Sequence, residues 1–103
     1  MNTEKMKTFI YRFYVGSNNN TKKPEIQKAI RIFNKNSVLG FSVLKGIKGI
    51  WNGQQESSFI LEVISTPENP FNDLRAKNLK KQLENDLRQF LVLSTKEQIN
   101  LLN

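Results

Sequence analysis

The dipeptide Asn52-Gly53 lies between two runs of strand-forming residues and constrains the fold more than any other feature of this sequence. Asn and Gly accept the positive backbone φ angles that a two-residue hairpin turn requires. The flanking segments, residues 40–51 and 54–65, are therefore predicted to pair as antiparallel strands. The second of them is apolar on both faces apart from one glutamate, which is typical of a strand inside a sheet.

Three further segments have the periodicity of regular secondary structure. Residues 7–15 alternate aromatic and β-branched side chains and predict a strand. After a loop, Pro24 stands where the first turn of a helix tolerates proline. One apolar stripe marks this helix, formed by Ile26, Ala29, Ile30 and Phe33. Asn69 can cap a second helix, whose buried side is marked by Leu74, Leu79, Leu83 and Leu87, with Ala76 on its flank.

Residues 89–93 predict a fourth strand, and the S-x-x-E pattern of Ser94 to Glu97 predicts a short C-terminal helix through Ile99, Leu101 and Leu102. The order of elements is that of one α+β domain over residues 1–103 with a ferredoxin-like split βαβ topology. We expect a four-stranded antiparallel sheet with two helices on one face. The first and third strands are then central neighbours, and the second face of the sheet is uncovered.

The composition removes several classes of site. The 103 residues include no cysteine and no histidine, which excludes disulfides, thiol nucleophiles, the usual zinc ligands and the commonest general base. No two carboxylates have the spacing of an acid–base pair, so we expect neither enzymatic activity, nor a metal, nor a cofactor. The net charge of +7 favours anionic partners, although a basic surface also serves solubility alone. No membrane-spanning run or signal peptide is recognised, which predicts a cytoplasmic protein.

The loop after the first strand is a candidate anion site. Gly16, Ser17, Asn18, Lys22 and Lys23 bring backbone N–H groups, a hydroxyl, an amide and two ammonium groups to the start of a helix. Unpaired N–H groups and the helix dipole favour a phosphate or a carboxylate there. The loop matches neither a Walker motif nor a dinucleotide fingerprint, and a solvated connecting loop is the plainer interpretation.

Trp51 stands directly before the predicted turn, and two interpretations of it are open. A cross-strand aromatic contact would fix the register of the hairpin. Alternatively, the indole stacks a base beside a strand that Gly46 and Gly49 make prone to bulging, and Glu56 accepts a hydrogen bond from a ribose or a base.

The uncovered sheet face is a candidate interface. If Phe9, Tyr11 and Phe13 of the first strand face the helices, then Ile10, Arg12 and Tyr14 lie on the uncovered face. Their neighbours there are either Ile60, Glu62 and Ile64 of the third strand or the alternate set of that strand. Outward isoleucines favour burial against another subunit, so a sheet-to-sheet homo-oligomer is predicted, with Arg12 and Glu62 as a pair across it.

Two short patterns carry a resemblance: Tyr14-x-Gly16-Ser17-Asn18-Asn19 and Gly49-x-Trp51-x-Gly53-x-x-Glu56. The chain resembles a group of small, mostly uncharacterised phage and mobile-element proteins with these patterns. The resemblance implies a role in counter-defence, in which a compact basic protein sequesters a cyclic or dinucleotide immune signal between subunits. The two patterns would then mark opposite walls of a nucleotide pocket, and a phage-encoded protein would act in the cytoplasm of the host cell.

The leading hypothesis is therefore a non-enzymatic, oligomeric protein that captures a small anionic ligand such as a nucleotide. Its ligand-binding residues would be Tyr14, Gly16, Ser17, Asn18, Lys22, Lys23, Trp51 and Glu56. One alternative is a nucleic-acid-binding regulator that uses basic helix faces with Lys28, Arg31, Lys35, Lys77, Lys80 and Lys81. The other is an inhibitor that docks on a host protein by sheet-edge pairing through the second strand of the hairpin.

Overall fold

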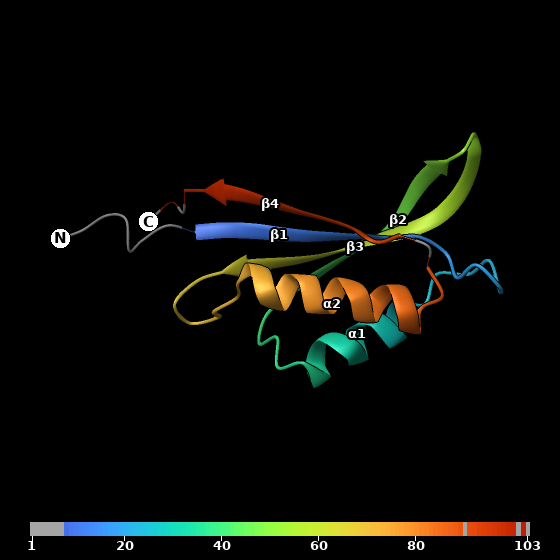
Figure 1. Ribbon diagram of the computed structural model, residues 1–103. Helices are drawn as coiled ribbons and strands as arrows, with labels where there is room; N and C mark the ends of the chain where they lie inside the picture. Colours follow the sequence, from blue (N-terminus) through green and yellow to red (C-terminus); the bar gives the residue numbers. More distant parts are fainter. Residues whose placement is uncertain (1–7, 90, 101, 103) are drawn as a thin grey trace.

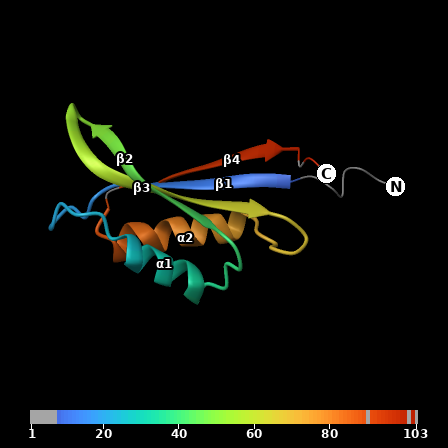
Figure 2. The ribbon, with the colours of Figure 1, turned by 180° about the vertical axis from the view of Figure 1, so that it is seen from behind.

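The computed structural model describes residues 8–89, 91–100 and 102, without the side chain of Trp51. A sheet and a layer of two helices lie face to face, and the helices cover one side of the sheet (Figures 1 and 2). The elements in chain order are β1 (Thr8–Val15), α1 (Ile26–Lys35), β2 (Ser42–Trp51), β3 (Gln54–Ser65), α2 (Asp73–Asp86) and β4 (Leu93–Ile99).

The four strands are arranged in the order β2-β3-β1-β4, and all neighbours are antiparallel. This confirms the predicted ferredoxin-like topology and the central position of the first and third strands. β2 and β4 are the edges. β3 pairs with β1 from Phe59 to Ser65 and offers no free edge there. Residues 54–58 pair with β2 alone, so the free edge predicted for the second strand of the hairpin is confined to that part.

The β2–β3 hairpin extends beyond the rest of the sheet and curls away from the helix layer (Figure 1). Its turn has the expected geometry, with φ of 51° at Asn52 and 77° at Gly53. The register shifts between Leu44 and Ile47, and Gly46 has a φ of 71° at this bulge. Because a bulge increases local twist, it turns the end of the hairpin over the open face of the sheet.

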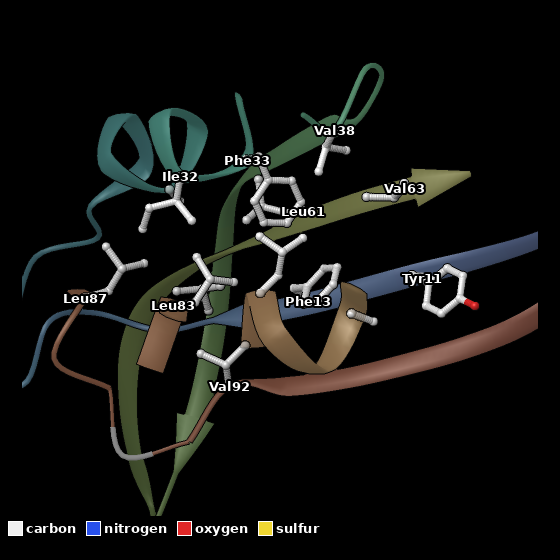
Figure 3. Close-up of a cluster of buried hydrophobic side chains, with 14 of the residues drawn as sticks. Tyr11, Phe13, Ile32, Phe33, Val38, Leu61, Val63, Leu83, Leu87 and Val92 are labelled. Atoms are coloured by element: carbon white, nitrogen blue, oxygen red, sulfur yellow. The ribbon is translucent and has the colours of Figure 1, made fainter. Parts of the chain in front are cut away.

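The core lies between the sheet and the helices (Figure 3). α1 buries Ala29, Ile32 and Phe33, and Phe33 meets Phe13 of β1 edge to face at 5.3 Å between ring centroids. Ile30, expected on the buried stripe, is only half-buried, and Ile32 takes its place. No helix in the described part of the chain is long and apolar enough to cross a membrane.

α2 begins one turn later than predicted. Its cap is Asn72, whose side chain accepts a hydrogen bond from the backbone N–H of Arg75 at 2.9 Å. Asn69, the predicted cap, instead donates to the carbonyl oxygen of Gly40 at 2.8 Å. Because an Asx side chain satisfies whichever backbone groups the chain places near it, the sequence alone did not distinguish the two positions.

The C-terminal segment differs from the prediction. The fourth strand is Leu93–Ile99 and not residues 89–93, so the S-x-x-E pattern lies inside a strand and caps no helix. Leu102 is 98% exposed and outside any helix, and Leu101 lies outside the described residues. Pairing along the whole of β1 satisfies a full ladder of backbone groups, and this long-range gain overrides the local capping pattern.

Candidate functional site

A groove opens on the helix-free face of the sheet, where β1 ends and the hairpin begins to curl. Its volume is about 310 Å³, at the lower end of the range for small-molecule sites. Residues from β1, β2, β3 and the segment after α2 line it. The polar ones include Tyr14, Asn19, Lys48, Glu56, Ser58 and Gln89, and apolar walls come from Ile47, Ile50, Ile60, Leu91 and Leu93.

Gly16 lets the carboxylate of Glu56 reach the end of β1. A Cβ atom at position 16 would lie 2.9 Å from the carboxyl carbon of Glu56 and 3.3 Å from Oε1 of Gln89. The first contact is shorter than packed carbon atoms allow. Across the hairpin, Gly49 pairs with Glu56, and a Cβ atom there would lie 3.6 Å from Cγ of Glu56. That second contact is an ordinary packing distance, so it is Gly16 that leaves room for the carboxylate in the groove.

Gln89 fixes the opposite wall. Its Oε1 accepts the backbone N–H of Gly16 at 3.2 Å, and its Nε2 donates to the carbonyl oxygen of Ser17. These bonds join the segment after α2 to the end of β1. Sequence reasoning missed Gln89, because no local pattern signals a contact between residues so far apart in the chain.

The polar side chains of the groove are largely free to meet a ligand. Tyr14 is 37% exposed, and within the described residues no hydrogen bond or ion pair engages the side chains of Tyr14, Lys48 or Glu56. Glu56 and Lys48 are the charged residues of the lining. No group of three acidic, His or Cys side chains in the described residues has the arrangement of a metal site.

The loop predicted to bind phosphate has its own partners. Ser17 and Asn18 are buried, and the Ser17 hydroxyl donates to the carbonyl oxygen of Ser57 at 2.7 Å. Oδ1 of Asn18 accepts the N–H groups of Asn20 and Thr21 at 2.7 and 3.1 Å, and its amide donates to Glu25 at 2.7 Å. This is an Asx-turn arrangement that shapes the loop.

The structure thus brings Tyr14, Gly16 and Glu56 together in the groove. Lys22 and Lys23 are exposed and lie outside its lining, and the buried Ser17 and Asn18 lie outside it as well. The backbone of Trp51 ends β2 opposite Gln54. Its side chain lies outside what the structure describes, and both interpretations of it stay predictions.

The open face carries the predicted residues. Ile10, Arg12 and Tyr14 pair with Ile64, Glu62 and Ile60 respectively. The Arg12 guanidinium donates to Glu62 at 2.9 Å and to Glu97 at 3.1 Å, and these carboxylates raise the pKa of Arg12. The predicted pair of Arg12 and Glu62 therefore forms within one chain and not across an interface.

A second polar cluster lies on the helix side of the sheet. The buried Tyr11 hydroxyl donates to Oδ1 of Asp73 at 2.8 Å, and Nζ of Lys96 reaches the same oxygen at 2.9 Å. Burial raises the pKa of Tyr11, and the hydrogen bond from Lys96, followed by that from Tyr11, lowers the pKa of Asp73. The cluster joins β1, α2 and β4 and is satisfied internally.

Neither a family model nor a curated protein matches the sequence. Solved structures do match. A ligand-free phage SAM lyase matches with a TM-score of 0.63 and 20% sequence identity, over 87% of this chain and 79% of that chain. A phage SAM lyase in complex with S-methyl-5'-thioadenosine matches with a TM-score of 0.57 and 19% sequence identity, over 91% of this chain and 90% of that chain. The PII-like protein CPII from Thiomonas intermedia K12, bound to ADP, AMP and bicarbonate, has 0.59 at 8%, covering 94% of each chain. CutA1 from Oryza sativa matches with a TM-score of 0.58 and 14% sequence identity, over 96% of this chain and 86% of that chain.

These similarities establish a shared fold. They also correct one prediction: the absence of His, Cys and paired carboxylates led us to expect a protein that is not an enzyme, and that inference fails because a lyase has this fold. Proteins with bound nucleotides have it as well. The fold therefore accommodates both the binding of small ligands and catalysis.

Proposed function

We propose that the groove binds an adenosine-containing ligand and that S-adenosylmethionine is the ligand on which the protein acts. One observation carries the proposal: Tyr14 and Glu56 line the same groove, which has apolar walls and a single ammonium group, that of Lys48. ADP, AMP and S-methyl-5'-thioadenosine, the ligands of the similar structures, share an adenosine group. An aromatic ring beside an apolar wall suits adenine, and a carboxylate suits ribose hydroxyls or a positive charge.

The charge of the groove favours a sulfonium ligand over a polyphosphate. A nucleoside diphosphate would need several cations, and the two loop lysines that sequence analysis assigned to phosphate lie outside the lining. S-adenosylmethionine carries a sulfonium, an ammonium and a carboxylate. Glu56 can pair with a positive group of this ligand, and Lys48 with its carboxylate. Nucleotide and cyclic-nucleotide signals are the competing ligands.

The apolar walls also suit a lyase reaction. When the C–S bond to the four-carbon chain breaks, its electron pair stays on sulfur, and the neutral thioether S-methyl-5'-thioadenosine leaves. The substrate's own carboxylate oxygen bonds to the released carbon and closes a lactone, so no external base is needed. Two opposite charges are neutralised in this step, and apolar surroundings favour such a transition state.

The test is to incubate the purified protein with S-adenosylmethionine and follow S-methyl-5'-thioadenosine by chromatography. We expect product from the wild-type protein and at least tenfold less from Glu56→Gln. The double variant Lys22→Ala/Lys23→Ala, altered outside the groove, should match the wild type. In parallel, the binding of ADP and of a cyclic dinucleotide is measured by titration calorimetry. Binding of these nucleotides without turnover of S-adenosylmethionine would contradict the proposed substrate.

We further propose that a second copy of the chain covers the open face. Leu44, Ile64 and Leu93 are exposed on it at 42%, 37% and 53%, and Leu93 also lines the groove. An apolar surface of this kind favours association, and a second subunit would also exclude water from the ligand. Sedimentation should show an oligomer for the wild type and a monomer for Ile64→Lys. Leu74 of α2 was predicted on the buried side of its helix but is 67% exposed, so Leu74→Lys is a matched surface change and should remain oligomeric. A monomeric wild type would contradict this proposal.

A protein that removes S-adenosylmethionine, or a nucleotide signal, from a host cell fits the counter-defence role that the phage resemblance implies. Expression of the wild type and of Glu56→Gln in infected cells tests this role. Equal phage yield with both proteins would contradict it.

A further inference from the structure

Positive charge is concentrated in one part of the chain. Between residues 20 and 50 the only acidic residue is Glu25, against seven basic residues: Lys22, Lys23, Lys28, Arg31, Lys35, Lys45 and Lys48. We propose that the outer face of α1, together with Lys45 of β2, binds the phosphate backbone of double-stranded nucleic acid. This function is separate from that of the groove.

The fold gathers four of these cations into one surface, here called the α1 patch: Lys28, Arg31, Lys35 and Lys45. Lys28, Arg31 and Lys35 are exposed and spaced at i, i+3 and i+7, so they follow one side of the helix. Lys45, beside the β2 bulge, lines a shallow depression with Lys28 and Arg31. On the other flank of α1, Lys28, Arg31 and Lys35 line a second depression with Gln82 and Asp86 of α2.

The α1 patch is poorly neutralised by the protein itself. Elsewhere, Lys80 is 2.7 Å from Glu84, and Lys96 is 2.9 Å from Asp73. On the patch, Lys28 has one long ion pair with Glu25, at 3.7 Å, and that glutamate also accepts a hydrogen bond from Asn18.

Within the described residues, Arg31, Lys35 and Lys45 form no ion pair. Neighbouring like charges on a helix repel one another. A bound polyanion would relieve this repulsion.

The chemistry of the α1 surface selects among polyanions. Its exposed residues are all polar: Gln27, Lys28, Arg31, Asn34 and Lys35. Its buried residues, Ala29, Ile32 and Phe33, are committed to the core. Ile26 and Ile30 are half-buried, so α1 has no exposed apolar side chain to insert into a lipid bilayer and no exposed aromatic ring to stack the bases of a single strand. A regular array of phosphates on a duplex is the partner that fits.

The patch and the groove lie on different layers of the molecule. The helices cover one face of the sheet (Figures 1 and 2), and the residues that line the groove place it on the other face. A duplex on α1 would therefore leave the groove accessible, so failure of either proposal leaves the other intact.

The experiment is a fluorescence anisotropy titration with a mixed-sequence DNA duplex of about 20 base pairs, repeated between about 50 and 200 mM KCl. If four cations each neutralise one phosphate, log Kobs should fall against log salt with a slope of about −3.6, or roughly a hundredfold over this range. The variant Arg31→Gln/Lys35→Gln should reduce the slope to about −1.8, because it removes two of the four contacts.

The matched control is Lys77→Gln/Lys81→Gln, which removes the same charge at the same i, i+4 spacing on α2. Neither residue lines the depression between the helices, so the slope should stay unchanged. An equal loss in both variants would show that net charge governs binding and would overturn the assignment to α1. Equal or tighter binding of the single strand, or of phosphatidylserine vesicles in place of the duplex, would also overturn it. Unfolding temperatures of both variants establish that each is folded.

Discussion

Tyr11 and Tyr14 lie on the same strand, three residues apart, in opposite surroundings. Tyr11 faces the helices, is 3% exposed and donates to Asp73, which also binds Lys96. Tyr14 faces the open side, is 37% exposed and, among the described residues, has no hydrogen-bond partner. A polar cluster whose members satisfy one another stabilises a fold, whereas an open cluster on a rigid scaffold has capacity left for a ligand. Substitutions of Tyr11 should therefore lower the stability of the fold, and substitutions of Tyr14 should mainly weaken ligand binding.

The largest expected effect comes from removing each ring. Tyr11→Ala should cost about 3–5 kcal/mol of unfolding free energy, because it leaves a cavity in the core and removes a buried hydrogen bond. Tyr14→Ala should cost about 1 kcal/mol or less, since its ring is partly solvated. Chemical denaturation measures both. Equal losses would show that the two tyrosines do not divide these roles.

Gly16→Ala should weaken ligand binding about tenfold to a hundredfold, because the added Cβ displaces the Glu56 carboxylate. The fold should survive, since the end of a long side chain can move away. Titration calorimetry with S-methyl-5'-thioadenosine measures the effect. Gly40→Ala is the control, because its Cβ would be 3.4 Å from the nearest atom, Nδ2 of Asn69, and far from the groove. Unchanged affinity in Gly16→Ala would place the ligand elsewhere.

A smaller change separates the two hydroxyls. Tyr11→Phe should lower the unfolding free energy by about 1 kcal/mol, because Asp73 loses one donor and retains Lys96. Tyr14→Phe should leave stability unchanged and weaken only ligand binding. Loss of stability in Tyr14→Phe would mean that this hydroxyl also serves the fold.

The smallest effect is a dependence on pH. Folding lowers the pKa of Asp73, because Lys96 and Tyr11 hydrogen-bond to its charged form. Its contribution to stability is therefore full above the ordinary carboxyl pKa of 3.8 and is lost as the pH falls through the lower folded value. Asp73→Asn should flatten this part of the acid limb in a plot of unfolding temperature against pH. Identical acid limbs would contradict the assigned role of Asp73.

The sequence predicted the topology well because its signals are local. Asn52-Gly53 defines its own turn, and the alternating pattern of β1 distinguishes the face with Tyr11 from the face with Tyr14. Local signals failed where a long-range contact competed. The end of the chain pairs with β1 and forms no capped helix, because strand pairing satisfies more backbone groups.

The site was predictable only in part for the same reason. Gly16 and Glu56 were both singled out, but their contact depends on the curl of the hairpin. The composition of the basic loop predicted an anion site, but the side chain of Asn18 is hydrogen-bonded within the loop. Gln89 gave no signal, since its importance arises only when α2 returns the chain to the end of β1.

The central claim is that the groove on the open face, and not the basic loop, receives an adenosine-containing ligand. A two-dimensional amide NMR titration with S-methyl-5'-thioadenosine tests it most directly. We predict that the largest shifts occur at Gly16, Gly49 and Glu56, with little change at Asn20 to Lys23. Shifts confined to the loop, or the absence of shifts in both the loop and the groove, would contradict the claim.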